Sequence, residues 1–322
     1  MPDKISVGLV SRTFFNLPLW AAMENGFFAD EDIAVETTII GNASQVPPLL
    51  DGTFQIMIGG CEPVIQNVAS GGPLRIVAGN TGKVTHSLIA RAPFKIVRDL
   101  KGATIGILSQ KEGTFFQLKE MLEKHGLHFP GDYNVKDTGG VPPRHKALLE
   151  GTIDAGLQSI PWNYVAEDAG MNNLGDVIDY IPDWQFVSTN ANGEWARANR
   201  ELLVRFLRGI FRGTSWFYEN REASARIAER ELPAPLAHAE RAWDHYTGTN
   251  ALTRDVSVND KGLRKVIDTL IQAGLLDRSA PREPAAGTGR EGMTTRSAFS
   301  PGLRSCSPIL PGQAPSPTCG SP

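Results

Sequence analysis

Apolar and polar positions follow two alternating periods along the chain, and this alternation predicts an α/β fold. Residues 5–10 form a short apolar run typical of a buried strand. Residues 17–28 carry apolar side chains at helical spacing, with Gly26 near the end of the helix. Residues 33–40 return to a strand pattern, and the alternation continues to about residue 169. This order is typical of βαβ units around mixed, mostly parallel sheets flanked by helices.

Two pieces of sequence recur at a shared offset of about one hundred residues. Residues 7–15 (VGLVSRTFF) resemble residues 105–116, where IGILS is followed after an insertion by TFF. Residues 49–54 (LLDGTF) resemble residues 148–153 (LLEGTI). Chance similarity between common βα turns is the alternative. The paired matches favour two lobes of like construction with a cleft between them.

Ligands in open parallel sheets bind beyond the carboxyl ends of the strands. The loops that follow equivalent strands of the two lobes are therefore expected to face each other across the cleft. These loops are residues 11–16 and 59–62 in the first lobe and residues 109–114 and 158–162 in the second.

The pattern changes in the last third of the chain. Residues 194–273 are almost wholly helical in their spacing. Residues 279–322 are rich in Pro, Gly, Ser, Ala and Arg and show no apolar period, so we expect a disordered tail. A frame-shifted or vector-derived end is one hypothesis for this composition.

Composition narrows the class of protein. The 322 residues suffice for about two domains, and 41% hydrophobic and 21% charged residues are ordinary globular values. A net charge of -3 offers no basic excess for a nucleic-acid partner, and no run approaches the roughly 20 apolar residues of a membrane-spanning helix. The start lacks the features of an export signal. We therefore expect either a mature periplasmic form with an added Met or a cytoplasmic protein.

Motifs for metal, cofactor or catalytic chemistry are missing from the sequence. The six His residues show no paired metal-ligand spacing, and no nucleophile elbow, phosphate-binding loop or dinucleotide fingerprint occurs. Cys61 is the one cysteine outside the tail, so no internal disulfide is expected in the body of the chain. We expect no metal and no cofactor.

Four motifs resemble a known family. Residues 99–107 (DLKGATIGI) resemble the segment that opens the second lobe of type 2 periplasmic binding proteins. Residues 25–28 (NGFF) with 33–36 (IAVE), residues 149–155 (LEGTIDA) and residues 199–207 (NRELLVRFL) resemble three further motifs of that family. The nitrate, sulfonate and taurine binders and the thiamine-pyrimidine binders are the groups that the chain is most similar to.

The resemblance implies a type 2 periplasmic-binding-protein-like fold with discontinuous lobes. Lobe 1 would contain residues 1–86 and 190–278, and lobe 2 residues 87–189, with crossings near residues 85–87 and 187–189. It also implies a monomeric solute-binding protein of an ABC importer, which passes its ligand to a membrane permease and catalyses no reaction. The ligand class would be a small organic anion or heterocycle, such as a sulfonate, a carboxylate, nitrate or a pyrimidine.

The loop at 109–114 is the first candidate for ligand contact. It lies between a strand and a helix, where free backbone N–H groups and hydroxyls can hold an anion. Ser109, Gln110, Gly113 and Thr114 are the candidates, and Gly113 would allow a close approach to the backbone. An ordinary helix cap is the alternative interpretation.

The equivalent loop of lobe 1 supplies Ser11, Arg12, Phe14 and Asn16. Arg12 could clamp a carboxylate or sulfonate with two parallel hydrogen bonds, and Phe14 could cover its apolar side. Phe14 and Phe15 face opposite ways on an extended backbone, so at most one should line the cleft. A surface arginine and a core phenylalanine are the alternatives.

The remaining binding candidates come from three loops. Cys61 and Glu62 follow the strand at 54–58, and the Glu62 carboxylate would suit an amine or a ring N–H, or else simply favour the start of a helix. Asn80 follows a further strand. Gln158 and Trp162 lie in the counterpart loop of lobe 2, where the chain reads IPW in place of the family's W-x-P.

An enzyme on the same scaffold is the alternative function. Cys61 at a helix start would be a nucleophile with a lowered pKa, and His86 its base. The related desulfinases carry their cysteine in the first cleft loop, where this chain has Thr13 and Phe14, and the cysteine cluster of the pyrimidine synthases is missing. A small packing residue is the other interpretation of Cys61.

Overall fold

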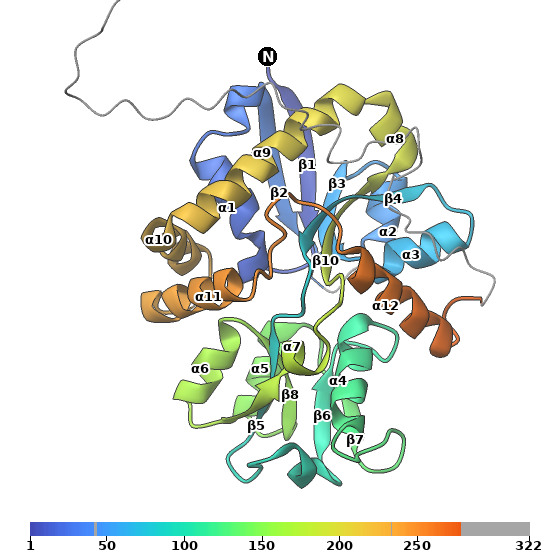
Figure 1. Cartoon of the computed structure of the whole chain (residues 1–322), viewed down its shortest axis with the longest axis vertical. Helices are drawn as coiled ribbons and strands as arrows, with labels where there is room; N and C mark the ends of the chain where they lie inside the picture. The colour runs from blue at the N-terminus through green and yellow to red at the C-terminus, as the bar shows by residue number, and fades with distance from the viewer. Residues whose placement is uncertain (42–43, 233, 278–322) are drawn as a thin grey trace, which may run out of the picture.

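The computed structural model describes residues 1–41, 44–232 and 234–277. Two lobes, each built on a five-stranded sheet flanked by helices, lie one above the other in Figure 1. The expected two-lobed α/β architecture is confirmed. The tail at 279–322, for which we predict disorder, lies outside the described residues.

The two sheets have the same plan. Sheet A, in lobe 1, has the order β2-β1-β3-β10-β4, and sheet B, in lobe 2, has the order β7-β6-β8-β5-β9. In each sheet the central strand β3 or β8 pairs with an antiparallel neighbour, β10 or β5, while the other strands run in one common direction. The strands of sheet A are β1 (Asp3–Leu9), β2 (Ile33–Ile39), β3 (Ile56–Gly60), β4 (Leu74–Thr81) and β10 (Val187–Asn192). Those of sheet B are β5 (His86–Ala90), β6 (Thr104–Ile107), β7 (Asn134–Asp137), β8 (Ala155–Ser159) and β9 (Asn172–Asp176).

The internal repeat is visible in this plan, since the repeated residues occupy equivalent strands. Residues 7–9 lie in β1 and residues 105–107 in β6, and each strand is flanked by a parallel neighbour on either side. The second repeated pair, at 49–54 and 148–153, ends a helix immediately before β3 and before β8. The sequence repeat is therefore a structural repeat of the two lobes.

The chain crosses between the lobes twice. It leaves sheet A after β4 and enters sheet B at β5, so residues 82–85 form the first crossing. It returns between α7 and β10, through residues 181–186. Residues 187–189 already pair with β3 and β4 in sheet A. The lobe boundaries drawn at 86/87 and 189/190 remain a prediction.

Helices cover both faces of each sheet, and the expected helical stretch at 194–273 consists of α8 to α12. Around sheet A lie α1 (Leu17–Glu24), α2 (Val46–Leu50), α3 (Glu62–Ala69), α8 (Gly193–Ala198), α9 (Arg200–Glu219), α10 (Arg221–Glu231), α11 (Leu236–Gly248) and α12 (Asp260–Gln272). Around sheet B lie α4 (Gly113–Glu123), α5 (Val141–Leu149), α6 (Trp162–Asp168) and α7 (Val177–Tyr180).

Glycines on α9 allow α1 to pack closely against it. A Cβ atom at Gly213 would lie 2.1 Å from the Pro18 carbonyl oxygen and 2.9 Å from the Ala22 side chain. Phe28, at the far end of the same contact, stacks on Phe206 with 5.3 Å between ring centroids. This packing anchors the loop between β1 and α1, which faces lobe 2.

We expect Gly213→Ala to lower the free energy of unfolding by about 1–3 kcal/mol, because the added methyl group meets backbone atoms that cannot move aside. Gly248→Ala is the matched control, since a Cβ there meets nothing within 4 Å at the end of α11. It should leave stability unchanged or raise it by up to about 1 kcal/mol. Urea unfolding of both variants measures the difference, and equal effects would contradict the close α1–α9 contact.

Candidate functional site

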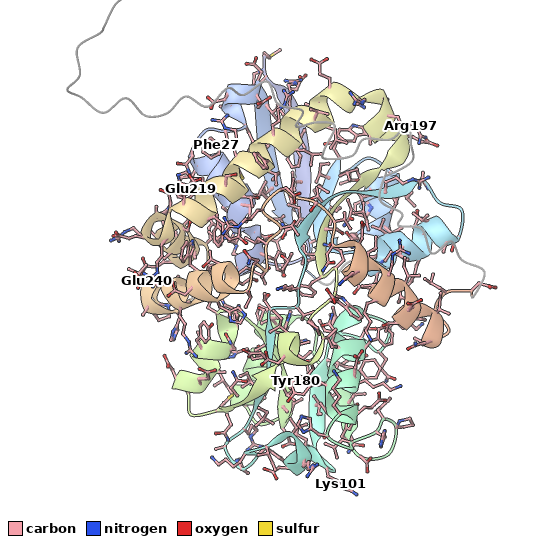
Figure 2. The ribbon with its side chains drawn as sticks, in the orientation of Figure 1. Phe27, Lys101, Tyr180, Arg197, Glu219 and Glu240 are labelled. Carbon is pink, nitrogen blue, oxygen red and sulfur yellow. The ribbon has the colours of Figure 1, made fainter. Side chains whose placement is uncertain are left out.

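The carboxyl ends of β1 and β3 face those of β6 and β8 across the seam between the lobes. Glu62, the first residue of α3, crosses this seam and rests on Gly113, the first residue of α4. A Cβ atom at Gly113 would lie 2.0 Å from Glu62 Oε1, so a glycine is needed for this approach. Side chains of both lobes meet along the seam, with Tyr180 on its lobe 2 side (Figure 2). The structure therefore brings two predicted site residues, Glu62 and Gly113, into direct contact.

The Glu62 carboxyl is buried, at 7% exposure. The pKa of Glu62 is raised to about 7, chiefly by burial and also by the nearby Glu112 carboxylate. The Glu62 backbone N–H and the Trp184 indole oppose the rise. Glu62 is therefore poised to gain or lose a proton near neutral pH.

Glu112 caps α4, a role that the sequence analysis did not assign to it. Its side chain accepts hydrogen bonds from the backbone N–H groups of Thr114 (2.9 Å) and Phe115 (3.2 Å), and the Thr114 hydroxyl donates to it as well. Burial is the main cause of a raised pKa for this carboxyl. Glu is uncommon at this capping position, where Ser, Thr, Asp and Asn are preferred, so the sequence offered no signal.

Arg144 on α5 is a buried cation that the sequence analysis missed. It is 3% exposed, and its side chain donates to the carbonyl oxygens of Leu157 (Nε, 2.7 Å) and Gly139 (Nη1, 3.3 Å). Burial lowers its pKa to about 10, while Glu112 opposes the shift from a distance. The guanidinium forms no ion pair with any carboxylate of residues 1–41, 44–232 and 234–277.

A signal for Arg144 was present in the helical spacing. Val141, Arg144 and Leu148 lie on one face of α5, and all three are buried. A charge on an otherwise apolar helical face marks either a paired core residue or a functional one.

Several buried polar atoms near the seam have no hydrogen-bond partner among the described residues. They are Asn16 Oδ1 from lobe 1 and His86 Nδ1, Ser159 Oγ and both amide atoms of Gln158 from lobe 2. His86 and Ser159 are register partners at the edge of sheet B that faces lobe 1. Each such atom costs about 1–3 kcal/mol when nothing satisfies it. These atoms are available for hydrogen bonds to a further group at the seam.

The Arg12 side chain does not reach this seam. Its guanidinium pairs with Glu231 Oε2 at 2.8 Å, and the Arg12 side chain is half exposed. The pair lies beside an open surface hollow of about 430 Å³. Ser11 Oγ lies 3.4 Å from Thr13 Oγ1, and Asn16 Nδ2 donates to the Ser11 carbonyl oxygen at 2.8 Å. Of this loop, Asn16 is the candidate whose side chain keeps an unpaired buried atom.

Phe14 is a core residue of lobe 1. It is fully buried and packs on Tyr246, with 4.8 Å between ring centroids. Phe15 instead lies edge-on to Phe186, which in turn packs edge-on to His86 at 5.1 Å. Phe15, rather than Phe14, is therefore the ring that fits the expectation of one ring turned toward the second lobe. Residues 14–16 form a short 3₁₀ helix, so the alternation expected of an extended segment does not apply to them.

The other candidates of lobe 2 have mixed surroundings. Gln110 is exposed, and Ser109 Oγ accepts a hydrogen bond from the Lys111 backbone N–H at 3.1 Å. Trp162 packs its ring on His145 at 5.0 Å, and its indole N–H is buried without a partner among the described residues.

Asn80 and Cys61 form local contacts. The Asn80 side chain accepts a hydrogen bond from the Thr81 hydroxyl at 2.7 Å. Cys61 is fully buried, and its thiol donates to the Gln185 carbonyl oxygen at 3.0 Å. Burial, followed by the charge of Glu62, raises the thiol pKa well above its usual value. The expectation of a lowered pKa at this helix start is wrong, because desolvation outweighs the helix dipole.

His86 has a pKa lowered to about 3, chiefly by burial and secondly by the charge of Arg144. It is therefore a neutral imidazole near neutral pH. In the described part of the chain, no three His, Cys, Asp or Glu side chains cluster as they would around a metal ion. No helix there is long and apolar enough to cross a membrane.

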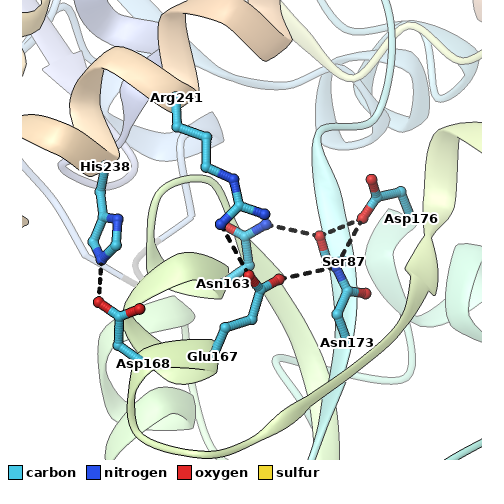
Figure 3. A network of polar contacts seen from close by, with 8 residues as sticks. All are labelled: Ser87, Asn163, Glu167, Asp168, Asn173, Asp176, His238 and Arg241. Carbon is cyan, nitrogen blue, oxygen red and sulfur yellow. Dashed lines mark hydrogen bonds and ion pairs between the residues drawn. The ribbon is translucent and has the colours of Figure 1, made fainter.

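A second contact between the lobes lies at the outer side of the seam, where α11 meets α6 (Figure 3). Arg241 pairs with Glu167 at 3.0 Å and stacks over the Tyr164 ring at 3.8 Å, and His238 contacts Asp168 at 2.7 Å. On the other flank, Lys265 of α12 pairs with Glu120 of α4 at 2.7 Å. These ion pairs therefore lie on either side of the contact between Glu62 and Gly113.

Comparison with known proteins agrees with the architecture. A family model described as NMT1/THI5 like matches residues 15–224. YtlA of Bacillus subtilis (strain 168), a proposed binding protein, is 22% identical over 294 residues, which is 86% of each chain. The 4-amino-5-hydroxymethyl-2-methylpyrimidine phosphate synthase of Uromyces fabae is 28% identical over 242 residues, 69% of each chain.

Two solved structures show the fold. The alkanesulfonate-binding protein SsuA from Xanthomonas axonopodis pv. citri, bound to MOPS, has a TM-score of 0.72 at 16% identity and covers 88% of this chain and 98% of its own. The ligand-binding component of an ABC-type import system from Staphylococcus aureus has a TM-score of 0.72 at 14% identity, with 87% and 99% covered. The periplasmic-binding-protein fold expected from the sequence is confirmed.

We expect stability to fall as pH rises from about 4.5 to 7, because in this window Glu62 ionises in the unfolded chain but stays largely protonated in the folded one. A carboxyl with a raised pKa binds its proton more tightly in the folded chain than in the unfolded one, so raising the pH favours unfolding in this window. Glu62→Gln mimics the protonated form and should be more stable than the parent by about 2–3 kcal/mol at pH 8, with little difference at pH 5.

Urea unfolding at pH 5, 6.5 and 8 measures this difference. Glu36→Gln, at a side chain that is 70% exposed, is the matched control and should follow the parent at each pH. A Glu62→Gln variant whose advantage does not grow with pH would contradict the burial of an ionisable Glu62.

Proposed function

Because the chain belongs to the NMT1/THI5-like family, we propose that it is the solute-binding protein of an ABC-type importer and closes on a small organic anion. The similar proteins support this, since they include a proposed binding protein, an alkanesulfonate-binding protein and a component of an ABC-type import system. The partners are then a small ligand and a membrane permease, and the place of action is the periplasm.

The buried Arg144 guanidinium is the observation that carries the proposal. A charge removed from water costs several kcal/mol unless a partner compensates it, and Arg144 has two backbone carbonyls but no carboxylate partner among the described residues. The guanidinium presents donors in a planar fork that suits the oxygens of a carboxylate or a sulfonate. A ligand anion supplies the missing partner.

The unpartnered polar atoms define the rest of the ligand environment. Gln158 and Ser159 offer an amide and a hydroxyl from lobe 2, and Asn16 offers an amide oxygen from lobe 1. Phe15 packs edge-on to Phe186, and Trp184 lies close to Gly113, so both rings add apolar surface near the seam. A compact organic anion with a short apolar part fits this combination better than a sugar or a metal ion.

Hinge closure is the proposed mechanism of capture. Arg144, Gln158 and Ser159 all belong to lobe 2, so the open form binds the anion there first. Closure around residues 82–85 and 181–186 then adds Asn16 and Glu62 from lobe 1, together with the ion pairs between α11 and α6. Closure can be driven only by contacts of this kind, which exist in the closed form and not in the open one.

An enzyme that uses Cys61 as a nucleophile is not favoured by any observation at the site. The thiol is buried, donates to a carbonyl oxygen and has a raised pKa, all of which oppose the thiolate. His86 is not paired with it by any hydrogen bond in the described residues.

A matched pair of arginine variants tests the function. Thermal-shift screening of sulfonates, carboxylates, nitrate and pyrimidines first identifies a ligand by the rise in the unfolding midpoint. Calorimetric titration should then show at least about 100-fold weaker binding for Arg144→Gln, since a buried charge pair is worth about 2–5 kcal/mol. Arg12→Gln, which removes an exposed charge paired with Glu231, should change the affinity by less than about threefold.

The unfolding midpoint of each variant without ligand shows that it folds. Loss of affinity in Arg12→Gln but not in Arg144→Gln would contradict the role of Arg144 and would place the anion-binding site at the loop of residues 11–16. Failure of every compound in the screen to raise the midpoint would contradict the proposal as a whole.

A further inference from the structure

Helix α11 of lobe 1 turns one side toward lobe 2. Near the end of the helix, Tyr246 shares a hydrogen bond of 2.8 Å with Thr85 of the first crossing, and both side chains are buried. Near its start, His238 and Arg241 contact α6 of lobe 2. His238 lies about 12 Å from Tyr246 along the helix axis, by the rise of an α-helix. A hinge motion at the crossing therefore separates the start of α11 from α6 much further than it separates Tyr246 from Thr85.

Arg241 makes two contacts with α6. Its guanidinium donates to Glu167 Oε2 at 3.0 Å and lies over the Tyr164 ring, 3.8 Å from the ring centroid. Exposed ion pairs stabilise a fold only weakly, but a guanidinium that is paired and stacked at the same time has a more closely defined position. Because Glu167 and Tyr164 both belong to α6, opening of the lobes breaks the two contacts together.

The partner carboxylate Glu167 is held in place by lobe 2 itself (Figure 3). Asn173 Nδ2 donates to Glu167 Oε1 at 3.1 Å and to Asp176 Oδ1 at 3.4 Å. Asp176 accepts from the Ser87 hydroxyl at 2.6 Å, and Asn163 Nδ2 donates to the same hydroxyl at 2.9 Å. This network does not depend on α11, so Glu167 keeps its position when the lobes separate. Its pair with α11 then forms again with a smaller loss of side-chain entropy than a pair of free side chains.

Arg241 is set apart from the proposed ligand contacts. Its side chain is 55% exposed and lines an open surface hollow of about 570 Å³, whereas Arg144 is 3% exposed. An effect of Arg241 on ligand affinity would therefore act through the position of the lobes.

We propose that Arg241 is a positioning residue for closure, which raises the affinity for ligand by holding α11 against α6 without touching the ligand. The inference rests on the proposed function, because it takes movement of the lobes as the step that captures the ligand. The Arg241 contacts join residues of different lobes, so they favour the closed form by the same amount whichever ligand binds. They also favour the closed form when no ligand is present.

Small-angle X-ray scattering of the ligand-free protein tests the effect on the lobes. Arg241→Gln should have a larger radius of gyration than the parent. Salt at about 0.5 M should expand the parent more than the variant, because it screens the ion pair that the variant lacks. Arg221→Gln is the matched control, since it removes an exposed pair with Asp244 of α11, at 2.8 Å, that lies within lobe 1. It should follow the parent in both conditions.

Calorimetric titration with propane-1-sulfonate and with butanoate tests the effect on binding. Arg241→Gln should weaken both anions by one common factor, roughly three- to tenfold, because the lost pair and stacking are shared by all closed forms. Stopped-flow fluorescence should assign this loss to faster dissociation, with the association rate unchanged. The exchanged pair Glu167→Arg with Arg241→Glu should recover part of the affinity that each single change removes, which a purely structural role of Arg241 would not produce.

The outcomes separate this inference from the proposed function. Equal radii of gyration for Arg241→Gln and the parent, unchanged affinity, or losses that differ between the two anions would each overturn the role of Arg241 and leave the proposed function standing. If neither anion binds the parent, the scattering comparison alone decides the role of Arg241, and the wider ligand screen decides the proposed function.

Discussion

A guanidinium buried at the seam between two lobes, without a carboxylate to pair with, is the constraint on which the rest of this molecule depends. Arg144 keeps its place through two backbone carbonyls, and its stem lies over Gly156, where a Cβ atom would come within 2.9 Å of Arg144 Cδ. Such an arrangement is costly for stability alone. An anion shared between the lobes would offset this energetic cost. The similar sheets, the two crossings and the flanking ion pairs bring the lobes together and hold them in contact.

The charge state of Glu62 is linked to the contact between the lobes. Its carboxyl reaches from lobe 1 to the start of α4 in lobe 2, so the contact exists only when the lobes meet. Burial of an ionised Glu62 carboxyl next to Glu112 is unfavourable in free energy, and protonation of Glu62 removes this penalty. Closure and the protonation of Glu62 are therefore expected to be coupled, because the contact that buries its carboxyl joins the two lobes. The same burial explains why Cys61, its neighbour in sequence, is a poor candidate for a nucleophile.

Much of the fold could be predicted from the sequence, because the βα alternation and the recurring LLDGTF and LLEGTI segments are local signals. The facing loops followed from the rule that ligands bind beyond the carboxyl ends of strands. The directions of individual side chains were harder to predict from the sequence. Arg12 and Phe14 were attractive by type, yet Arg12 turns to Glu231 and Phe14 to the core, since their directions depend on helices α10 and α11 far along the chain. Arg144 was overlooked because its burial arises only when α5 packs over Gly106 and Gly156.

The most direct test of the account is a crystal structure of the protein with a bound anion found in the ligand screen. We expect closed lobes, with the acid group of the ligand within hydrogen-bond distance of the Arg144 guanidinium and with Asn16 and Gln158 contacting the same molecule. An anion bound instead in the exposed hollow beside Arg12, with the Arg144 guanidinium still unpaired, would contradict it.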